Sequence, residues 1–432
     1  MRPSPLQPDT GNSPHTHTGR LVDHTPAGHE ATIHLLASLP RCAGLLTLLL
    51  VGLLWGSTAP TAHAQWAAEA TVFTRIGVEN NVFKSPSALQ QGGTILRRDS
   101  LIKQDAIYQF GGAVALERSL GQRHELALDL DATRQRYGTF PNQNERSHDV
   151  ELDYAYDAPG RLTFSTTLDR RWRRSVGTNV LGDELNRLFS YRHWEVTPEL
   201  AWDVSEVASL SLDYRRRWRT YDTQDDLLPL SYDGDRVRLI SWLRFRDAAR
   251  PQWVYLRASV RSKQYREYLA RDLDGRQDEA YPTNTLRYAS LRAKYNLDVT
   301  DEVAWQAGVL LRRRVDTFKG YYNYRYARLG TGVVWQIFPS ATIEADAKWR
   351  HYVYDEKSAS APDEPLRYNY VDVDLEVAYE VRPYLDVIAA METDQRFSNV
   401  GNVARRTRRS YTMYTVAAGL RLDVAQLYED VR

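Results

Sequence analysis

A two-residue alternation of apolar and polar side chains recurs along the chain from Ala67 to Val424. In the segment 371–377, valine and leucine alternate with aspartate and glutamate. Successive side chains of a strand point to opposite faces, so each such segment has one apolar and one polar face. We count about 16 segments, and a barrel of that size is too wide for side chains to fill. The polar faces must then line a water-filled interior while the apolar faces meet lipid, which predicts an all-β, transmembrane antiparallel β-barrel.

The connections between the expected strands alternate in length. Short turns are expected at 119–123, 157–160, 205–208, 247–252, 298–302, 338–340 and 381–383. Longer polar connections are expected near 80–101, 138–147, 175–190, 220–235, 266–284, 315–322, 355–366 and 393–409. Outer-membrane barrels have short periplasmic turns, long external loops and an even number of strands. The tally therefore predicts about 16 strands whose first and last members both end on the short-turn side.

The N-terminal segment has the pattern of an export signal. A short apolar run, Leu45 to Trp55, follows Arg41 and precedes Ala62-His63-Ala64. A basic flank, a short apolar stretch and an Ala-x-Ala site are typical of a secretory signal peptide. We therefore predict an N-terminal extension and signal peptide over residues 1–64, and a barrel over residues 65–432.

The composition narrows the function classes. Lysine and arginine number 56 against 55 aspartates and glutamates, a balance that argues against a nucleic-acid partner. The 11 tryptophans and 27 tyrosines could supply the aromatic girdles that barrels place at both membrane interfaces.

The strand and turn pattern of residues 65–432 resembles that of the Gram-negative outer-membrane β-barrel class, and within this class it is porin-like. Asn80-Asn81-Val82-Phe83, after the first expected strand, is similar to a short motif near the start of some β-barrel porins. The resemblance implies a place in the outer membrane and contact with its lipids and lipopolysaccharide. It also implies insertion by the barrel assembly machinery, and it leaves an oligomeric assembly open.

The alternation also assigns charged side chains to the inner face. Acids predominate there on the first four and last three expected strands, and bases predominate on the seventh to twelfth. Because the first and last strands close the barrel, these sets would form two facing walls with a transverse field, resembling the constriction zone of general porins. We expect the acidic wall to include Asp129, Glu151, Asp153, Asp374 and Glu376. We expect the basic wall to include Arg236, Arg238, Arg244, Arg257 and Arg292, with the charges near mid-strand having most effect. The alternative is that the walls pair with each other and close the interior with salt bridges.

Three arginines, Arg170, Arg174 and Arg216, have the parity of the lipid-facing side near the loop ends of their strands. Arginine facing lipid costs about 2–4 kcal/mol at the membrane midplane and little near the interface. These side chains are expected either to contact phosphates of the outer-leaflet glycolipid or to extend into the headgroup layer without a specific partner.

The remaining candidate sites are weak. The histidines after the expected cleavage site, His124, His148, His193 and His351, fall on different strands without a spaced pair, so we predict no metal site and no cofactor. Asp272-Leu273-Asp274-Gly275 is explained by an Asp-Gly turn. Since no catalytic constellation is recognisable, we predict that the protein is not an enzyme.

The leading functional prediction is a porin-like outer-membrane channel for passive diffusion of small polar or charged solutes. The alternative is a non-conducting surface barrel that acts as an adhesin or as a component of polysaccharide or lipoprotein export.

Overall fold

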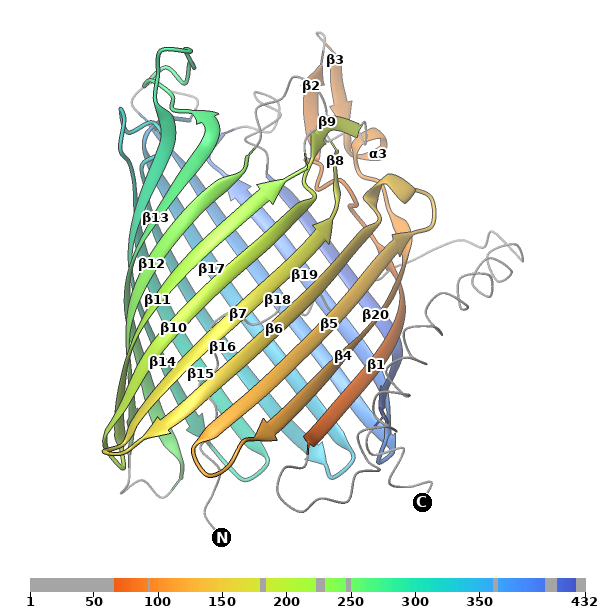
Figure 1. The fold of residues 1–432 in the computed structure, drawn as a ribbon. Coiled ribbons are helices and arrows are strands. Elements are labelled where there is room, and N and C mark those ends of the chain that lie inside the picture. Colours follow the sequence, from red (N-terminus) through yellow and green to blue (C-terminus); the bar gives the residue numbers. More distant parts are fainter. Residues whose placement is uncertain are drawn as a thin grey trace.

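Sixteen antiparallel strands close into one barrel (Figure 1). The computed structural model describes residues 66–91, 94–178, 184–222, 230–245, 250–359, 364–400 and 410–424. The barrel strands are β1 (Trp66–Glu79), β4 (Asp105–Ser119), β5 (His124–Tyr137), β6 (Glu145–Ala158), β7 (Leu162–Arg174), β10 (Tyr191–Ser205), β11 (Ala208–Tyr221), β12 (Tyr232–Arg244), β13 (Gln252–Leu269), β14 (Thr283–Asp298), β15 (Val303–Asp316), β16 (Tyr324–Phe338), β17 (Ala341–Ser358), β18 (Pro365–Arg382), β19 (Leu385–Ser398) and β20 (Tyr411–Asp423). The predicted fold class and strand number are confirmed.

The connections alternate as predicted. Residues 120–123, 206–207 and 383–384 join β4 to β5, β10 to β11 and β18 to β19 at one end of the barrel. The longer connections lie at the opposite end, where Figure 1 shows β2 (Ala88–Gln91), β3 (Thr94–Arg97), β8 (Val176–Thr178), β9 (Glu184–Leu188) and α3 (Arg98–Leu101) above the rim. A short 3₁₀ helix, η1 (Pro141–Gln143), lies in the β5–β6 connection. β1 begins and β20 ends at the short-turn end (Figure 1). In the described part of the chain, no helix is long and apolar enough to cross a membrane.

The barrel closes between its first and last strands. β1 pairs with β20 from Thr71↔Asp423 to Glu79↔Thr415. Beyond the last of these pairs, Asn80 Oδ1 accepts a hydrogen bond from the Tyr414 backbone N–H at 2.9 Å, and Asn81 Nδ2 donates to the Thr412 carbonyl at 3.0 Å. The Asn80-Asn81-Val82-Phe83 motif therefore extends the closing seam with side-chain hydrogen bonds.

The outer face of the barrel is apolar. Leu212, Leu239 and Leu291, on β11, β12 and β14, expose 51%, 48% and 55% of their surface. Asp213, which directly follows Leu212, is 1% exposed. The alternation thus sends leucines outwards, where the curvature spreads side chains apart, and charged groups inwards, where the concave wall crowds them together. An apolar outer wall is what a lipid environment requires.

The predicted signal peptide and N-terminal extension, residues 1–64, lie outside the described residues, so that prediction stays untested.

Candidate functional site: the charged lumen

The inner face is identified by ion pairs that bridge non-adjacent strands. Arg75 on β1 reaches Glu376 on β18 with a 2.7 Å contact between a guanidinium nitrogen and Oε2. Two strands, β19 and β20, lie between them in the barrel. Side chains from strands separated by two others can meet only on the concave, inner side of the wall. Side chains with the parity of Arg75 and Glu376 therefore face the lumen.

Three of the predicted acidic residues lie together. Asp129 on β5 and Glu151 on β6 are register partners. Asp153 follows two residues after Glu151 on the same face and accepts a hydrogen bond from the Thr167 hydroxyl of β7. Glu151 is in turn the register partner of Asp169 on β7. Four carboxyl groups are thus placed on three adjacent strands.

The other two predicted acids are paired with bases. Asp374 accepts a hydrogen bond from Lys348 of β17 at 3.0 Å. Glu376 lies between two guanidinium groups, Arg75 at 2.7 Å and Arg421 at 3.0 Å. The charge of this part of the wall is therefore largely balanced locally.

All five predicted bases lie on three adjacent strands, β12, β13 and β14. Arg236 of β12 is the register partner of Arg261, and Arg257 of β13 is the partner of Arg292 on β14. Arg257 and Arg292 both lie over the Tyr255 ring, at 6.0 and 5.8 Å from its centre. Arg244 is the last residue of β12, so it lies at the short-turn end rather than near mid-strand, away from the other four.

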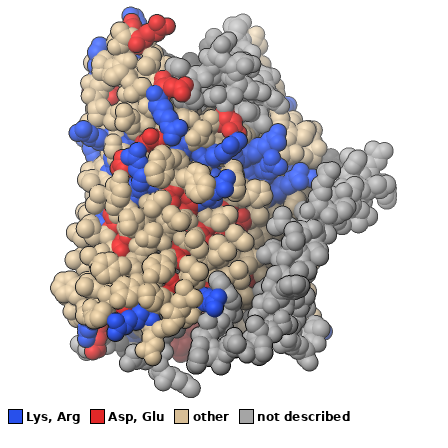
Figure 2. Space-filling model, in the orientation of Figure 1, with Lys and Arg blue, Asp and Glu red and all other residues tan. Residues whose placement is uncertain are grey.

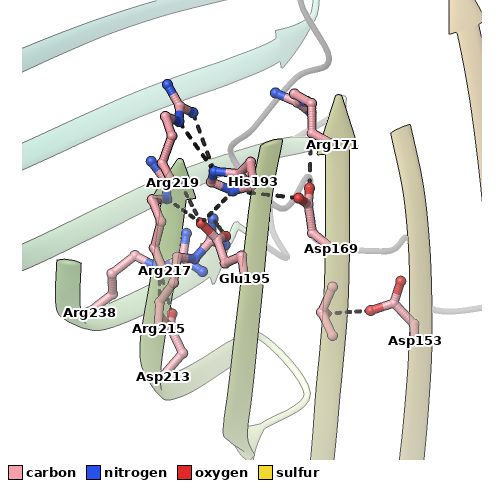
Figure 3. A network of polar contacts seen from close by, with 11 residues as sticks. Asp153, Asp169, Arg171, His193, Glu195, Asp213, Arg215, Arg217, Arg219 and Arg238 are labelled. Carbon is pink, nitrogen blue, oxygen red and sulfur yellow. Dashed lines mark hydrogen bonds and ion pairs between the residues drawn. The ribbon is translucent and has the colours of Figure 1, made fainter. Parts of the chain in front are cut away.

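Arg238, the remaining base, belongs to a buried polar network (Figure 3). Its Nε donates to both Asp213 carboxylate oxygens, at 2.8 and 2.6 Å. Glu195 lies on β10, the strand beside β11, and is ion-paired with both Arg215 and Arg217 of β11. The side chains of Asp213, Glu195 and Arg238 are at most 3% exposed. This network runs from β7, the strand next to the expected acidic wall, to β11 and β12, the first strands of the expected basic wall.

His193 occupies the centre of the same network (Figure 3). Its Nε2 lies 3.5 Å from carboxylate oxygens of both Asp169 and Glu195, and its Nδ1 lies 3.4 Å from Arg219. Sequence reasoning did not assign this grouping, although the alternation alone places Asp169, His193 and Glu195 on the inner face. Whether these three side chains lie together depends on the register between β7 and β10. The residues that connect the two strands do not reveal that register.

The described residues contain no group of three or more histidine, cysteine, aspartate or glutamate side chains arranged to hold a metal ion. In the β13–β14 connection, the backbone N–H of Arg276 donates to the Asp272 carboxylate at 2.8 Å and lowers the pKa of that carboxyl group. Gly275 has φ +81° there. The Asp272–Gly275 segment is therefore the turn predicted from the sequence.

The three arginines with lipid-facing parity, Arg170, Arg174 and Arg216, are the outward arginines, and they differ in their surroundings. Arg170 lies over two indole rings, 4.0 Å from that of Trp172 and 4.5 Å from that of Trp194. Arg216 donates to both carboxylate oxygens of Asp235, at 2.8 and 2.7 Å. Arg174 is the last residue of β7, at the long-loop end. Figure 2 shows lysine and arginine side chains in a band across the upper part of the outer surface.

A closed 16-strand barrel with an apolar outer wall and a charged interior defines the outer-membrane β-barrel class, and its place is the outer membrane. No protein-family model and no curated protein sequence matches the chain.

Several solved structures are similar to this chain. OccAB1 of Acinetobacter baumannii is 7% identical over 83% of this chain and 97% of its own, with a TM-score of 0.43. OprB of Pseudomonas putida is 10% identical over 83% and 94%, with a TM-score of 0.42. CdiB of Escherichia coli is 14% identical over 84% and 64%, with a TM-score of 0.45.

Proposed function

We propose that this protein is an outer-membrane channel through which small polar or charged solutes diffuse passively, and that opposed charged regions of its lumen bias which ions pass. The single observation that carries the proposal is the closed 16-strand barrel with charged side chains facing inwards. Barrels of this size normally leave an aqueous channel between their walls.

The placement of the charges supports a transverse field. Asp129, Glu151 and Asp153 lie on β5 and β6, whereas Arg236, Arg257 and Arg292 lie on β12 to β14. In the strand order of the barrel, these two groups are separated by β7, β10 and β11 in one direction and by β15 to β20, β1 and β4 in the other. Fixed charges of opposite sign on separate parts of a pore wall act strongly on ions and dipoles within it.

The ion pairs of the lumen determine which acidic residues are suitable for a test of ion selectivity. Neutralising Glu376 would leave Arg75 and Arg421 without the carboxylate they share, so its effect on selectivity would be mixed. The group Asp129, Glu151 and Asp153 is the better acidic probe, because these carboxylates lie beside one another on adjacent strands.

The test is the reversal potential of single channels in a planar bilayer under a KCl gradient. Combining Asp129→Asn, Glu151→Gln and Asp153→Asn should shift selectivity towards anions by at least about twofold. Combining Arg236→Gln, Arg257→Gln and Arg292→Gln should shift it towards cations. Both shifts should shrink as salt rises, since lumen charges are screened over ~10 Å at about 0.1 M salt.

The matched control is the pair Arg287→Gln and Arg313→Gln, which removes positive charge from the outer face of β14 and β15 and should leave selectivity unchanged. A protein that conducts no ions under any condition would contradict the channel. It would favour a surface barrel serving adhesion or export.

A further inference from the structure

The lumen wall near the long-loop end is aromatic as well as charged. From β10 to β18, tyrosines with lumen-facing parity lie near the long-loop ends of the strands. We call them the tyrosine arc: Tyr191, Tyr221, Tyr232, Tyr265, Tyr288, Tyr324, Tyr326, Tyr352, Tyr354, Tyr368 and Tyr370.

Neighbouring rings of the arc touch across strands. The centres of Tyr326 on β16 and Tyr352 on β17 are 4.6 Å apart, and those of Tyr352 and Tyr370 on β18 are 5.6 Å apart. On β17 and β18, Tyr354 and Tyr368 are 6.0 Å apart. These are the separations of edge-to-face and offset aromatic pairs, which hold rings in fixed orientations. The arc is therefore an ordered layer of rings across several strands. Tyr232, Tyr324, Tyr326 and Tyr368 are buried within this layer, whereas Tyr352 and Tyr370 are half-buried and keep part of their surface open.

Cationic groups lie among these rings. Lys263 lies 3.9 Å from the centre of Tyr232, and Arg314 lies 4.1 Å from that of Tyr324. Arg396 of β19 lies 4.1 Å from the centre of Tyr368 and extends the series by one strand. Further contacts of the same kind join Arg219 to Tyr191, Arg261 to Tyr288, Arg312 to Tyr326 and Arg350 to Tyr370. Flat aromatic faces and positive charges thus alternate along the wall.

The arc has the length of an extended ligand. With its cations it covers ten adjacent strands, β10 to β19. Since neighbouring strands are about 4.8 Å apart, this corresponds to roughly 40 Å along the wall. A single small solute would use only one ring and one cation, whereas a chain of repeated units could use the series.

Sugar rings suit such a surface, because their C–H faces stack on aromatic rings while their hydroxyl groups accept and donate hydrogen bonds. Arginine adds recognition of carboxylate, sulfate or phosphate groups through paired N–H donors. Along β13, Lys263 is followed towards mid-strand by Arg261 and Arg257, so the positive charge continues from the arc into the lumen.

We propose that the tyrosine arc is a binding surface for anionic oligosaccharides at the long-loop mouth of the lumen. The proposal deepens the channel function and names its solute class, but the binding itself does not require conduction. The two can therefore fail separately.

The test is isothermal titration calorimetry on the detergent-solubilised full chain with two tetrasaccharides, tetragalacturonate and the neutral maltotetraose. Tetragalacturonate should bind at least about tenfold more tightly than maltotetraose at low salt, and this advantage should fall as salt rises. Equal binding of the two sugars, or no binding of either, would overturn the proposal.

Variants locate the surface. Tyr352→Leu and Tyr370→Leu should each weaken tetragalacturonate binding about tenfold, because each removes a stacking face. Tyr352→Phe keeps the ring and should retain most of the affinity, which separates stacking from a folding defect. The matched control is Tyr379→Leu on the outer face of β18, where the side chain is 52% exposed. Tyr379→Leu should bind as the unaltered protein does, and an equal loss in this control would contradict the assignment.

Conductance measured on the same preparation distinguishes the two proposals. Binding without conductance would contradict the proposed channel function and support the saccharide-binding surface. Conductance without saccharide binding would contradict the saccharide-binding surface and support the channel.

Discussion

Asp213 and Arg238 show how a charge is held inside this wall. Their side chains are 0% and 3% exposed, and the two groups share paired hydrogen bonds. Taking two ions out of water costs several kcal/mol, which good geometry offsets only while both partners are present. Arg215 and Arg236, register partners on the same strands, add positive charge close by. Asp213 is therefore the counter-charge that allows this part of the basic strands to pack.

Loss of this carboxylate should be costly. We expect Asp213→Ala to lower the free energy of unfolding by about 3 kcal/mol, since Arg238 would remain buried without its partner. Urea unfolding in detergent micelles measures the change. The double variant Asp213→Leu with Arg238→Met should recover most of the stability, because it removes both charges and keeps the volume. A single variant no less stable than the double would contradict this account.

Among the elements, the seam between β1 and β20 contains the described glycine with the least room for a side chain, Gly419. A Cβ atom added to Gly419 would lie 2.0 Å from the Thr74 carbonyl oxygen and 2.8 Å from the Arg75 Cα. Both are backbone atoms, so neither can rotate away. Glycine at this position therefore lets β1 approach β20 closely enough to close the barrel.

This predicts a position-specific effect on stability. Gly419→Ala should destabilise the barrel by about 1–3 kcal/mol, as overpacking does elsewhere. Gly330→Ala on β16 is the matched control, because its Cβ would meet its nearest atoms at 3.7 Å, an ordinary contact. Thermal unfolding, followed by the loss of the compact form on electrophoresis, should show a lower midpoint for Gly419→Ala only. Similar midpoints for the two variants would argue against strain at the seam.

The outward arginines on β7 and β11 give a second prediction at this scale, which concerns lipid. Replacing Arg170, Arg174 and Arg216 with glutamine should reduce the glycolipid phosphate that co-purifies with the folded barrel, if these side chains contact outer-leaflet phosphates. Arg170, which lies against two indole rings, should contribute more than Arg216, which already has Asp235 as a partner. Phosphorus analysis of the purified protein measures the loss.

The control for that experiment is a second triple variant, Arg118→Gln, Arg123→Gln and Arg161→Gln, which removes the same charge at the short-turn end. It should leave the co-purified glycolipid unchanged. If neither triple variant changes the lipid content, the arginines extend into the headgroup layer without specific contacts.

For the whole molecule, the alternation of connection lengths predicts the orientation in the membrane. Long loops of outer-membrane barrels are external and short turns are periplasmic. After Cys42 has been replaced by serine, Asp274→Cys should react on intact cells with a maleimide that cannot cross the membrane. Pro339→Cys and Gln122→Cys should react only after the cells are broken. The opposite labelling pattern would contradict the orientation.

The sequence alone determined the class of the protein, the number of strands and the face of each side chain. These follow from local rules: alternation has a period of two residues, as in 371–377, and turn residues such as Asp157-Ala158-Pro159-Gly160 interrupt it. For the same reason, the inward parity of Asp129, Glu151, Arg257 and Arg292 could be read without a structure.

Only the tertiary structure decided which inward side chains meet. Arg75 and Glu376 are 301 residues apart in the chain, and His193 lies between Asp169 and Glu195 only because of the register between β7 and β10. The tyrosine arc likewise depends on how rings from separate strands come to the same height. A shift of two residues between strands keeps every face but changes every neighbour, and the register depends on pairing around the whole closed barrel. That is why faces can be predicted from local sequence, whereas the contacts inside the lumen cannot.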